Sequence, residues 1–179
     1  MAVPEHPAER PLQQQPEPWL RGPLPGVHPL VAPVFLSFAQ VREDLSRFTS
    51  GLTFQQIWKT FPPAPSLGFH LRHIAGSVNR LATYLAGSQL TSVQLHDLHH
   101  ESEPSADLPE LLNNIDASLR AAESILSQLD PSSADQPRFV GRLHLPTTVI
   151  GLIVHLSEHT QRHLGQAITT AQMLRRGYA

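Results

Sequence analysis

The sequence His155-Leu-Ser-Glu-His159-Thr-Gln-Arg-His163-Leu-Gly165-Gln166, near the C-terminal end of the chain, contains three histidines spaced four residues apart. Residues four apart lie on one face of a helix, so a helix here would bring His159 and His163 together. With His159 as the origin of a helical wheel, Leu152 lies at roughly +20° and His163 at roughly +40°, within an apolar arc. His155 falls at the polar border of that arc. The pattern predicts a helix over residues 146–176 that turns two histidines towards a core.

Three further segments repeat apolar residues every three or four positions, which is typical of amphipathic helices. They cover residues 30–49, 66–87 and 107–129, and Thr53-Phe-Gln-Gln56 adds a capping box that predicts a short helix. Residues 89–106 are polar and are predicted to form a loop. Residues 138–143 form a short extended stretch before the last helix.

These segments predict an all-α fold: a four-helix bundle with one long crossover connection, plus a short extended hairpin before the last helix. The crossover is either the first or the second connection between the long helices. Nine of the 17 prolines fall within the first 33 residues, and proline at this density prevents a packed helix. We therefore expect a flexible, proline-rich N-terminal arm over residues 1–28 and one bundle domain over residues 29–179. The alternative is that Trp19-Leu20 dock on the domain.

Composition excludes several classes of protein. The formal net charge is −2 and there is no basic run, which argues against nucleic acid as a partner. The absence of cysteine excludes disulfides and a cysteine nucleophile and is compatible with a reducing cytoplasm. The N-terminus lacks the pattern of a signal peptide, and no apolar run has the length of a membrane span. We expect a cytoplasmic protein without a membrane partner.

Histidine is the best soft metal ligand that a chain without cysteine can offer. Two buried imidazoles without partners would cost roughly 1–3 kcal/mol each, and one ion bound by His159 and His163 would satisfy both. A third ligand could come from Phe69-His70-Leu-Arg-His73. The apolar stripe of that helix centres roughly 120° from His73, with His70 about halfway between, so the wheel leaves both residues open.

Other interpretations of the histidines compete with a metal site. Each inward histidine could be an ordinary core residue that donates a hydrogen bond to a carbonyl or hydroxyl, and His96, His99 and His100 form a rival cluster in the polar segment. The run His155-Leu-Ser-Glu158-His159 also fits the H-x-x-E-H pattern of inverzincin peptidases. Such enzymes need an acidic ligand well downstream, however, and Glu158 points away from the face of His159. We therefore do not favour a peptidase.

With these motifs in this order, the chain resembles the DinB/YfiT superfamily of metal-binding helical bundles. The resemblance covers residues 30–176 and is carried by Ser66-Leu-Gly-Phe-His70-Leu-Arg-His73-Ile-Ala-Gly-Ser and by residues 155–166. The family pattern is a histidine followed by an aliphatic residue in the second helix. In the last helix it is two histidines four apart, followed by Gly-Gln. Carried over to this sequence, the metal ligands fall on His73, His159 and His163.

The resemblance also implies a function. It implies a site of three histidines with an open coordination position that binds nickel, zinc or another divalent ion. Several members of the superfamily are similar to thiol-dependent transferases or isomerases, and others are similar to hydrolases. It implies a small-molecule substrate, a low-molecular-weight thiol cosubstrate in some cases, and a homodimer. Since this chain has no cysteine, any thiol must come from the cosubstrate. The alternative function is a non-catalytic, metal-stabilised helical module for binding or stress response.

Overall fold

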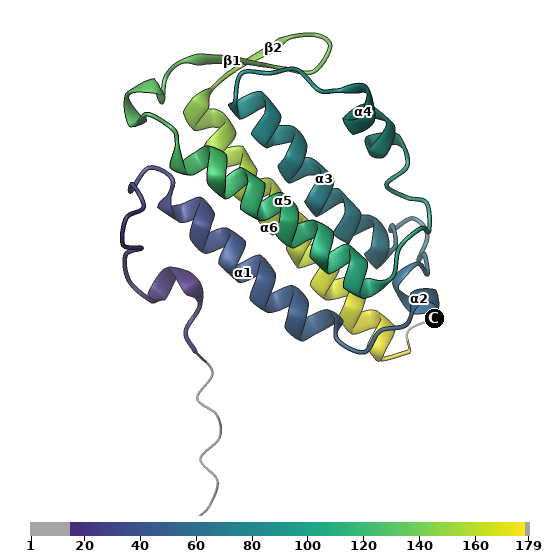
Figure 1. Cartoon of the computed structure of the whole chain (residues 1–179). Coiled ribbons are helices and arrows are strands. Elements are labelled where there is room, and N and C mark those ends of the chain that lie inside the picture. Colours follow the sequence, from purple (N-terminus) through teal and green to yellow (C-terminus); the bar gives the residue numbers. More distant parts are fainter. Residues whose placement is uncertain (1–14, 178–179) are drawn as a thin grey trace, which may run out of the picture.

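Four long helices form a bundle in the computed structural model, which describes residues 15–177 (Figure 1). They are α1 (Ala32–Thr49), α3 (Leu67–Leu85), α5 (Leu108–Ser127) and α6 (Val149–Arg175). The shorter elements are η1 (Pro18–Leu20), α2 (Phe54–Ile57), α4 (Ser92–His99), η2 (Pro131–Ser133), β1 (Pro137–Val140) and β2 (Leu145–Thr148). The predicted all-α bundle with a hairpin before the last helix is confirmed.

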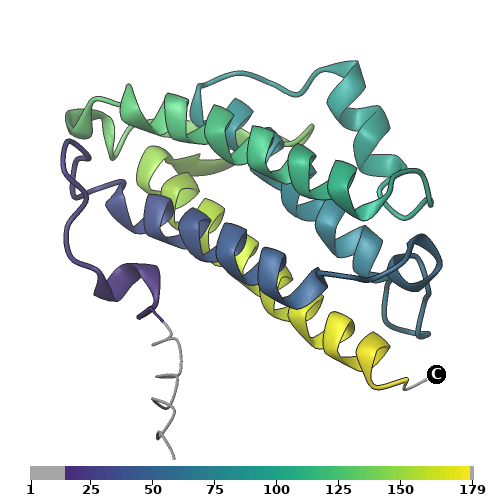
Figure 2. The same cartoon turned by 60° about the horizontal axis from the view of Figure 1, so that its bottom comes forward.

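The helices run in two directions, and this identifies the crossover. Figure 1 shows α1 and α6 running one way and α3 and α5 the other, so the connection from α3 to α5 has to return along the whole bundle. α3 packs against both α5 and α6, and α6 also packs against α1, whereas α1 contacts α5 less extensively (Figure 2). The crossover is thus the second connection between long helices, and α4 lies within it.

The apolar stripes of the four long helices meet in one core. On α3, Leu71, Ile74 and Val78 are completely buried, as their spacing predicted. Each of the other long helices contributes completely or almost completely buried apolar side chains, including Phe38, Val41, Leu111, Leu119, Leu156 and Ala167. The core therefore occupies the interior along the whole length of the bundle.

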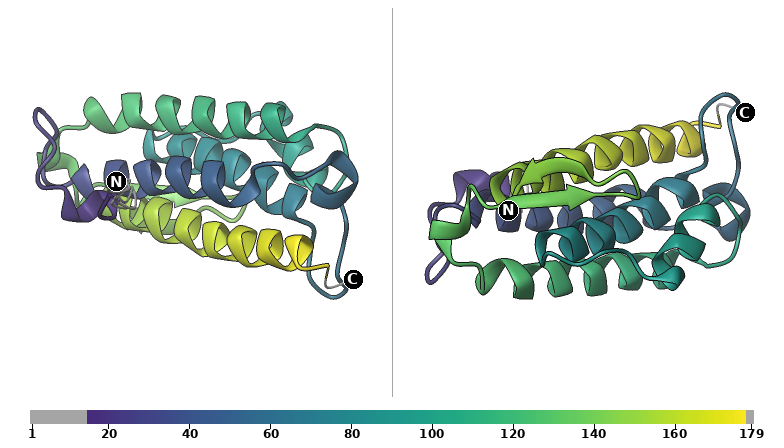
Figure 3. Two further views of the ribbon diagram at one scale, coloured as in Figure 1. Left: turned by 90° about the horizontal axis from the view of Figure 1, so that it is seen from below. Right: turned by 90° about the horizontal axis from the view of Figure 1, so that it is seen from above.

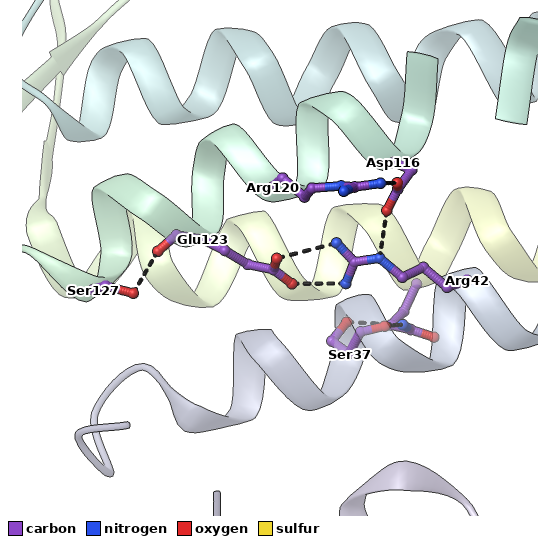
Figure 4. Close-up of polar contacts among 7 residues, drawn as sticks. Ser37, Arg42, Asp116, Arg120, Glu123 and Ser127 are labelled. Atoms are coloured by element: carbon purple, nitrogen blue, oxygen red, sulfur yellow. Dashed lines mark hydrogen bonds and ion pairs between the residues drawn. The ribbon is translucent and has the colours of Figure 1, made fainter. Parts of the chain in front are cut away.

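Ion pairs join α1 to α5, where the packing is thinner. The Arg42 guanidinium donates from Nε to Asp116 Oδ1 at 2.8 Å and from Nη1 and Nη2 to the two oxygens of Glu123 at 2.7 and 3.1 Å (Figure 4). The side chains are partly exposed, at 31% for Arg42 and 20% for Glu123. Exposed pairs contribute only about 0–1 kcal/mol, so this contact fixes the register of the two helices more than it stabilises the fold.

Side-chain caps set the beginnings of the helices. Ser66 Oγ accepts from the Phe69 amide at 3.1 Å at the start of α3, and Thr53 and Gln56 form the predicted capping box of α2. The last helix begins at Val149 and not at residue 146, because Pro146 and Thr148 belong to β2. Thr148 then caps α6 by accepting from the Gly151 amide at 3.1 Å.

The prediction of a loop over residues 89–106 is wrong in part, because α4 occupies its middle. Thr91 and Gln94 form a complete capping box at the start of this helix, a sequence signal equivalent to the one that identified α2. No residue of α4 is buried, so periodicity gave no sign of it. The helix is held to α3 by Gln94, whose amide donates to Thr83 Oγ1 at 2.7 Å.

The β1–β2 hairpin lies over one end of the bundle (Figure 3). Its strands pair antiparallel from Pro137 with Thr148 to Val140 with Leu145, and Gly141 takes a φ of +70° in the turn. β1 contacts α3 and β2 contacts α6. Arg138 Nε donates to the Leu85 carbonyl at 2.9 Å, which satisfies an acceptor at the C-terminus of α3.

Residues 1–14 lie outside the described part of the chain, so the flexible arm stays a prediction. Residues of η1 lie against α1: Pro18 is buried, whereas the Trp19 side chain is 63% exposed. The Arg21 guanidinium donates to both oxygens of Glu43 on α1 at 2.6 and 2.7 Å. Over residues 15–177, no helix combines the length and the apolar character that crossing a membrane requires.

Trp58 packs on the first turn of α3 and requires glycine there. Its indole donates to the Ala106 carbonyl at 2.9 Å, and a Cβ on Gly68 would lie 2.6 Å from the ring. Gly165, within α6, has no atom within 4 Å of the corresponding position. An added methyl group would therefore clash with the indole ring at Gly68 and would have free space at Gly165.

We predict opposite effects for alanine at these two positions. Gly68→Ala should lower the free energy of unfolding by about 1–3 kcal/mol, because the ring of Trp58 has to move. Gly165→Ala should raise it by about 0.5–1 kcal/mol through helix propensity alone. Urea unfolding followed by circular dichroism measures both. Equal effects from the two substitutions would contradict the packing of Trp58 on α3.

Candidate metal centre

Histidines from α3 and α6 meet where these helices pack together. His73 Nε2 lies 2.9 Å from His159 Nε2, and one ring nitrogen from each of His73, His159 and His163 lies within 4.8 Å of the other two. The ring centroids of His159 and His163 are 4.7 Å apart, as expected for helical neighbours at a spacing of four. Among the described residues, no other group of histidine and acidic side chains converges in this way.

His70 is brought to the same place but does not join the three converging nitrogens. Its side chain is buried, with 3% of the residue exposed, and its Nδ1 lies 3.3 Å from His163 Nδ1. The helical wheel predicted that His70 points inward, and the burial of this residue agrees with it. The residue whose ring nitrogen converges with both His159 and His163, however, is His73.

Glu101 is the residue of this site that the sequence did not reveal. It follows α4 in the crossover, in the polar segment, yet only 4% of it is exposed. Its Oε2 lies 2.6 Å from His73 Nδ1, and its Oε1 accepts from Arg80 Nη1 at 2.7 Å. No local pattern marks this residue, because its burial depends on contacts with a helix some twenty residues earlier.

His155 stands apart, as the wheel indicated. Its side chain is 44% exposed, and its Nδ1 lies 2.6 Å from Glu158 Oε1. Glu158 also pairs with Arg162 on the surface of α6, so its carboxylate is turned away from the cluster and does not support a peptidase site. The rival cluster lies on and just after α4, where His100 Nδ1 bonds to the His96 carbonyl at 2.7 Å.

His70, His159 and His163 are neutral at pH 7 because their pKa values are lowered. Burial lowers the pKa of His159 and of His163 to about 4, and the nearby charge that His73 would carry adds to the effect. Burial and His73 lower the pKa of His70 to about 4 in the same way. Neutral imidazoles keep a lone pair free, which is the form in which histidine binds metals.

The pKa of Glu101 is shifted in the direction that keeps it charged. Burial opposes ionisation of this carboxyl group, but the hydrogen bond with His73 and the charge of Arg80 outweigh it and hold the pKa below its usual value. An anion therefore lies directly behind His73.

The donor set fits a divalent transition metal. Imidazole nitrogens suit zinc, nickel, copper and iron, and three protein ligands leave a coordination position for water or substrate, as in catalytic zinc sites. The cluster could therefore bind such an ion through His73, His159 and His163.

Two cavities of the bundle have none of the four histidines in their walls. One, of about 800 Å³, lies between α3, α4 and α5, and Glu101, Arg72 and Arg80 belong to its wall. The other, of about 550 Å³, lies between α1 and α6 and includes Trp19 from the N-terminal segment. Glu101 thus separates the first cavity from His73.

This chain belongs to the DinB superfamily. The family model matches residues 37–167, which is more than half of the chain and includes all four histidines of the site. A solved structure with a similar fold is the conserved protein of locus from Enterococcus faecalis, with a TM-score of 0.63 over 77% of this chain and 92% of that one. At 16% identity, this likeness shows the fold alone. Among curated proteins, none matches the sequence.

We predict that the metal-free protein loses stability in mild acid. His70, His159 and His163 have pKa values near 4 in the folded chain against an ordinary 6.5, so between these pH values the unfolded chain binds more protons. Their contribution is fully present above about pH 6.5 and is lost as the pH falls towards 4. Urea unfolding with a chelator present measures this slope. It should be shallower in a His159→Ala/His163→Ala variant, and an unchanged slope would contradict the assignment.

Proposed function

We propose that this protein binds one divalent ion, nickel or zinc, through His73, His159 and His163, with a coordination position left open. The observation that carries this proposal is the convergence of three nitrogens within 4.8 Å from two helices distant in sequence. The depressed pKa values of His159 and His163 support it, because they keep these two ligands unprotonated at pH 7. Membership of the DinB superfamily agrees with it.

We further propose that the site is enzymatic and acts on a small molecule in the cytoplasm. When bound at such a site, the ion would lower the pKa of a coordinated water or thiol and so provide a nucleophile at neutral pH. This chemistry suits a thiol-dependent transferase or isomerase, or a hydrolase. The chain has no cysteine, so the thiol of the first class would be a low-molecular-weight cosubstrate. A homodimer is part of the proposal, and sedimentation at micromolar concentration measures it.

A second candidate function is a non-catalytic module in which the ion only stabilises the bundle. The observation in its favour is that the three converging histidines come from both α3 and α6, so a bound ion would connect the two helices. A purely structural site is closed, however, and usually has four protein ligands. Here three nitrogens converge, and the fourth histidine, His70, faces His163.

We expect purified protein to carry about one divalent ion per chain. Alanine at His159, His163 or His73 should abolish this, whereas His155→Ala is the matched control and should leave it unchanged, because His155 bonds to Glu158 on the surface. His70→Ala should weaken binding without abolishing it. Elemental analysis after gel filtration measures the metal content. Full metal content in the His159→Ala protein would refute the site.

The open position can be tested with the cobalt-substituted protein. Azide or a small thiol should change its visible absorption spectrum, because an exogenous ligand can enter an open site. A spectrum that neither ligand changes would favour the structural module over the enzyme. The same titration on the His155→Ala protein controls for binding elsewhere on α6.

A further inference from the structure

The carboxylate of Glu101 lies on the far side of His73 from the cluster, with Oε2 2.6 Å from Nδ1. We propose that Glu101 is a positioning residue, which holds the hydrogen of the His73 ring on Nδ1 and thereby keeps the Nε2 lone pair directed at His159 and His163. This inference rests on the proposed metal site and deepens it. Glu101 would orient the His73 ring before any ion binds.

The hydrogen-bonding capacity of the groups leaves one arrangement. An ionised carboxylate can only accept, and a neutral imidazole carries one hydrogen on one of its two nitrogens. A short contact between Glu101 Oε2 and His73 Nδ1 therefore requires the hydrogen on Nδ1. In the neutral ring, which is the form that binds a metal, the other nitrogen then has the free lone pair, and it is this Nε2 that lies 2.9 Å from His159 Nε2. A carboxylate behind a histidine ligand generally orients the ring and raises its basicity.

The rest of α3 is arranged to hold this carboxylate in place. Arg80 Nη1 donates to Glu101 Oε1 at 2.7 Å, so both oxygens are engaged. Arg72 Nη1 donates to the backbone carbonyls of His100 at 2.6 Å and Glu103 at 2.9 Å, on either side of Glu101. One arginine thus binds the side chain and the other binds the backbone that carries it.

Gly76 completes the arrangement by leaving room for it. A Cβ at this position would lie 2.5 Å from Glu101 Oε1 and 2.6 Å from Arg80 Nη1. Arg72, Gly76 and Arg80 are spaced by four residues, so they follow one another along a single face of α3. That face binds the crossover segment, and His73 is adjacent to it on the side of α6.

If Glu101 only stabilised the fold, its ion pair with Arg80 would be sufficient, and its contact with His73 would have no separate effect. Both roles predict some loss of stability when Glu101 is changed, so stability does not separate them. The tautomer of His73 does, because it depends on whether the group behind Nδ1 accepts or donates.

The test is Glu101→Gln, with Glu103→Gln as the matched control in the same segment, where the side chain is 66% exposed. Glutamine has one oxygen, and Arg80 can only donate to it, so the amide NH2 faces His73 Nδ1 as a donor. In the metal-free protein, nitrogen-15 shifts of the imidazole rings should show the hydrogen of His73 on Nδ1 in the wild type and in Glu103→Gln. In Glu101→Gln it should move to Nε2.

Zinc affinity, measured by competition with a chelating indicator, should fall roughly 10–100-fold in Glu101→Gln and not in Glu103→Gln. An unchanged tautomer and affinity in folded Glu101→Gln would overturn the inference. So would a wild-type His73 with its hydrogen on Nε2, a measurement that needs no variant. The proposed function fails differently: a wild-type protein with the hydrogen on Nδ1 that binds no metal would remove the site itself, and with it the role of Glu101 towards a metal.

Discussion

The packing of α3 against α6 brings the candidate metal ligands together. It buries the apolar stripes of both helices, and at its border it places His73 against His159 and His163. Because the two helices run in opposite directions, residues 86 positions apart meet within hydrogen-bonding distance. The same helix α3 also carries the two arginines that hold the crossover. One helix thus carries His73 and also holds the carboxylate behind it.

Three of the four imidazoles in this small volume, those of His70, His159 and His163, are uncharged at pH 7. Protonated histidines at these distances would repel one another, and partial burial penalises each charge further. The low pKa values of His70, His159 and His163 express that balance. Glu101, whose carboxylate contacts His73, also pairs with Arg80, so it orients His73 while its charge is compensated. The low pKa values of these histidines and the convergence of the rings therefore both favour nitrogen lone pairs that are available to a metal ion.

Much of the fold could be predicted from local patterns, and the site only in part. Apolar periodicity identified the four long helices, and the spacing of four placed His159 and His163 together. The choice between His70 and His73 could not be made from a wheel, because a wheel assumes that all partners pack along one line. Both residues lie against α6: His70 Nδ1 is 3.3 Å from His163 Nδ1, and His73 Nε2 is 2.9 Å from His159 Nε2. Glu101 could not be found, since its burial is created by Arg72 and Arg80 across the crossover.

The crossover between α3 and α5 has a consequence for how the site comes into being. Three stretches of chain supply this centre: α3 carries His73, the crossover carries Glu101, and α6 carries His159 and His163. They meet only when the crossover spans the bundle and α6 has packed against α3. A fragment that ends before α6 lacks the pair, and an isolated α6 lacks the third imidazole and its carboxylate. Closing these long loops lowers the conformational entropy of the chain, and this cost precedes any contact between these side chains. Formation of the centre therefore coincides with completion of the tertiary topology, and a bound ion would favour the closed chain over every partly assembled one.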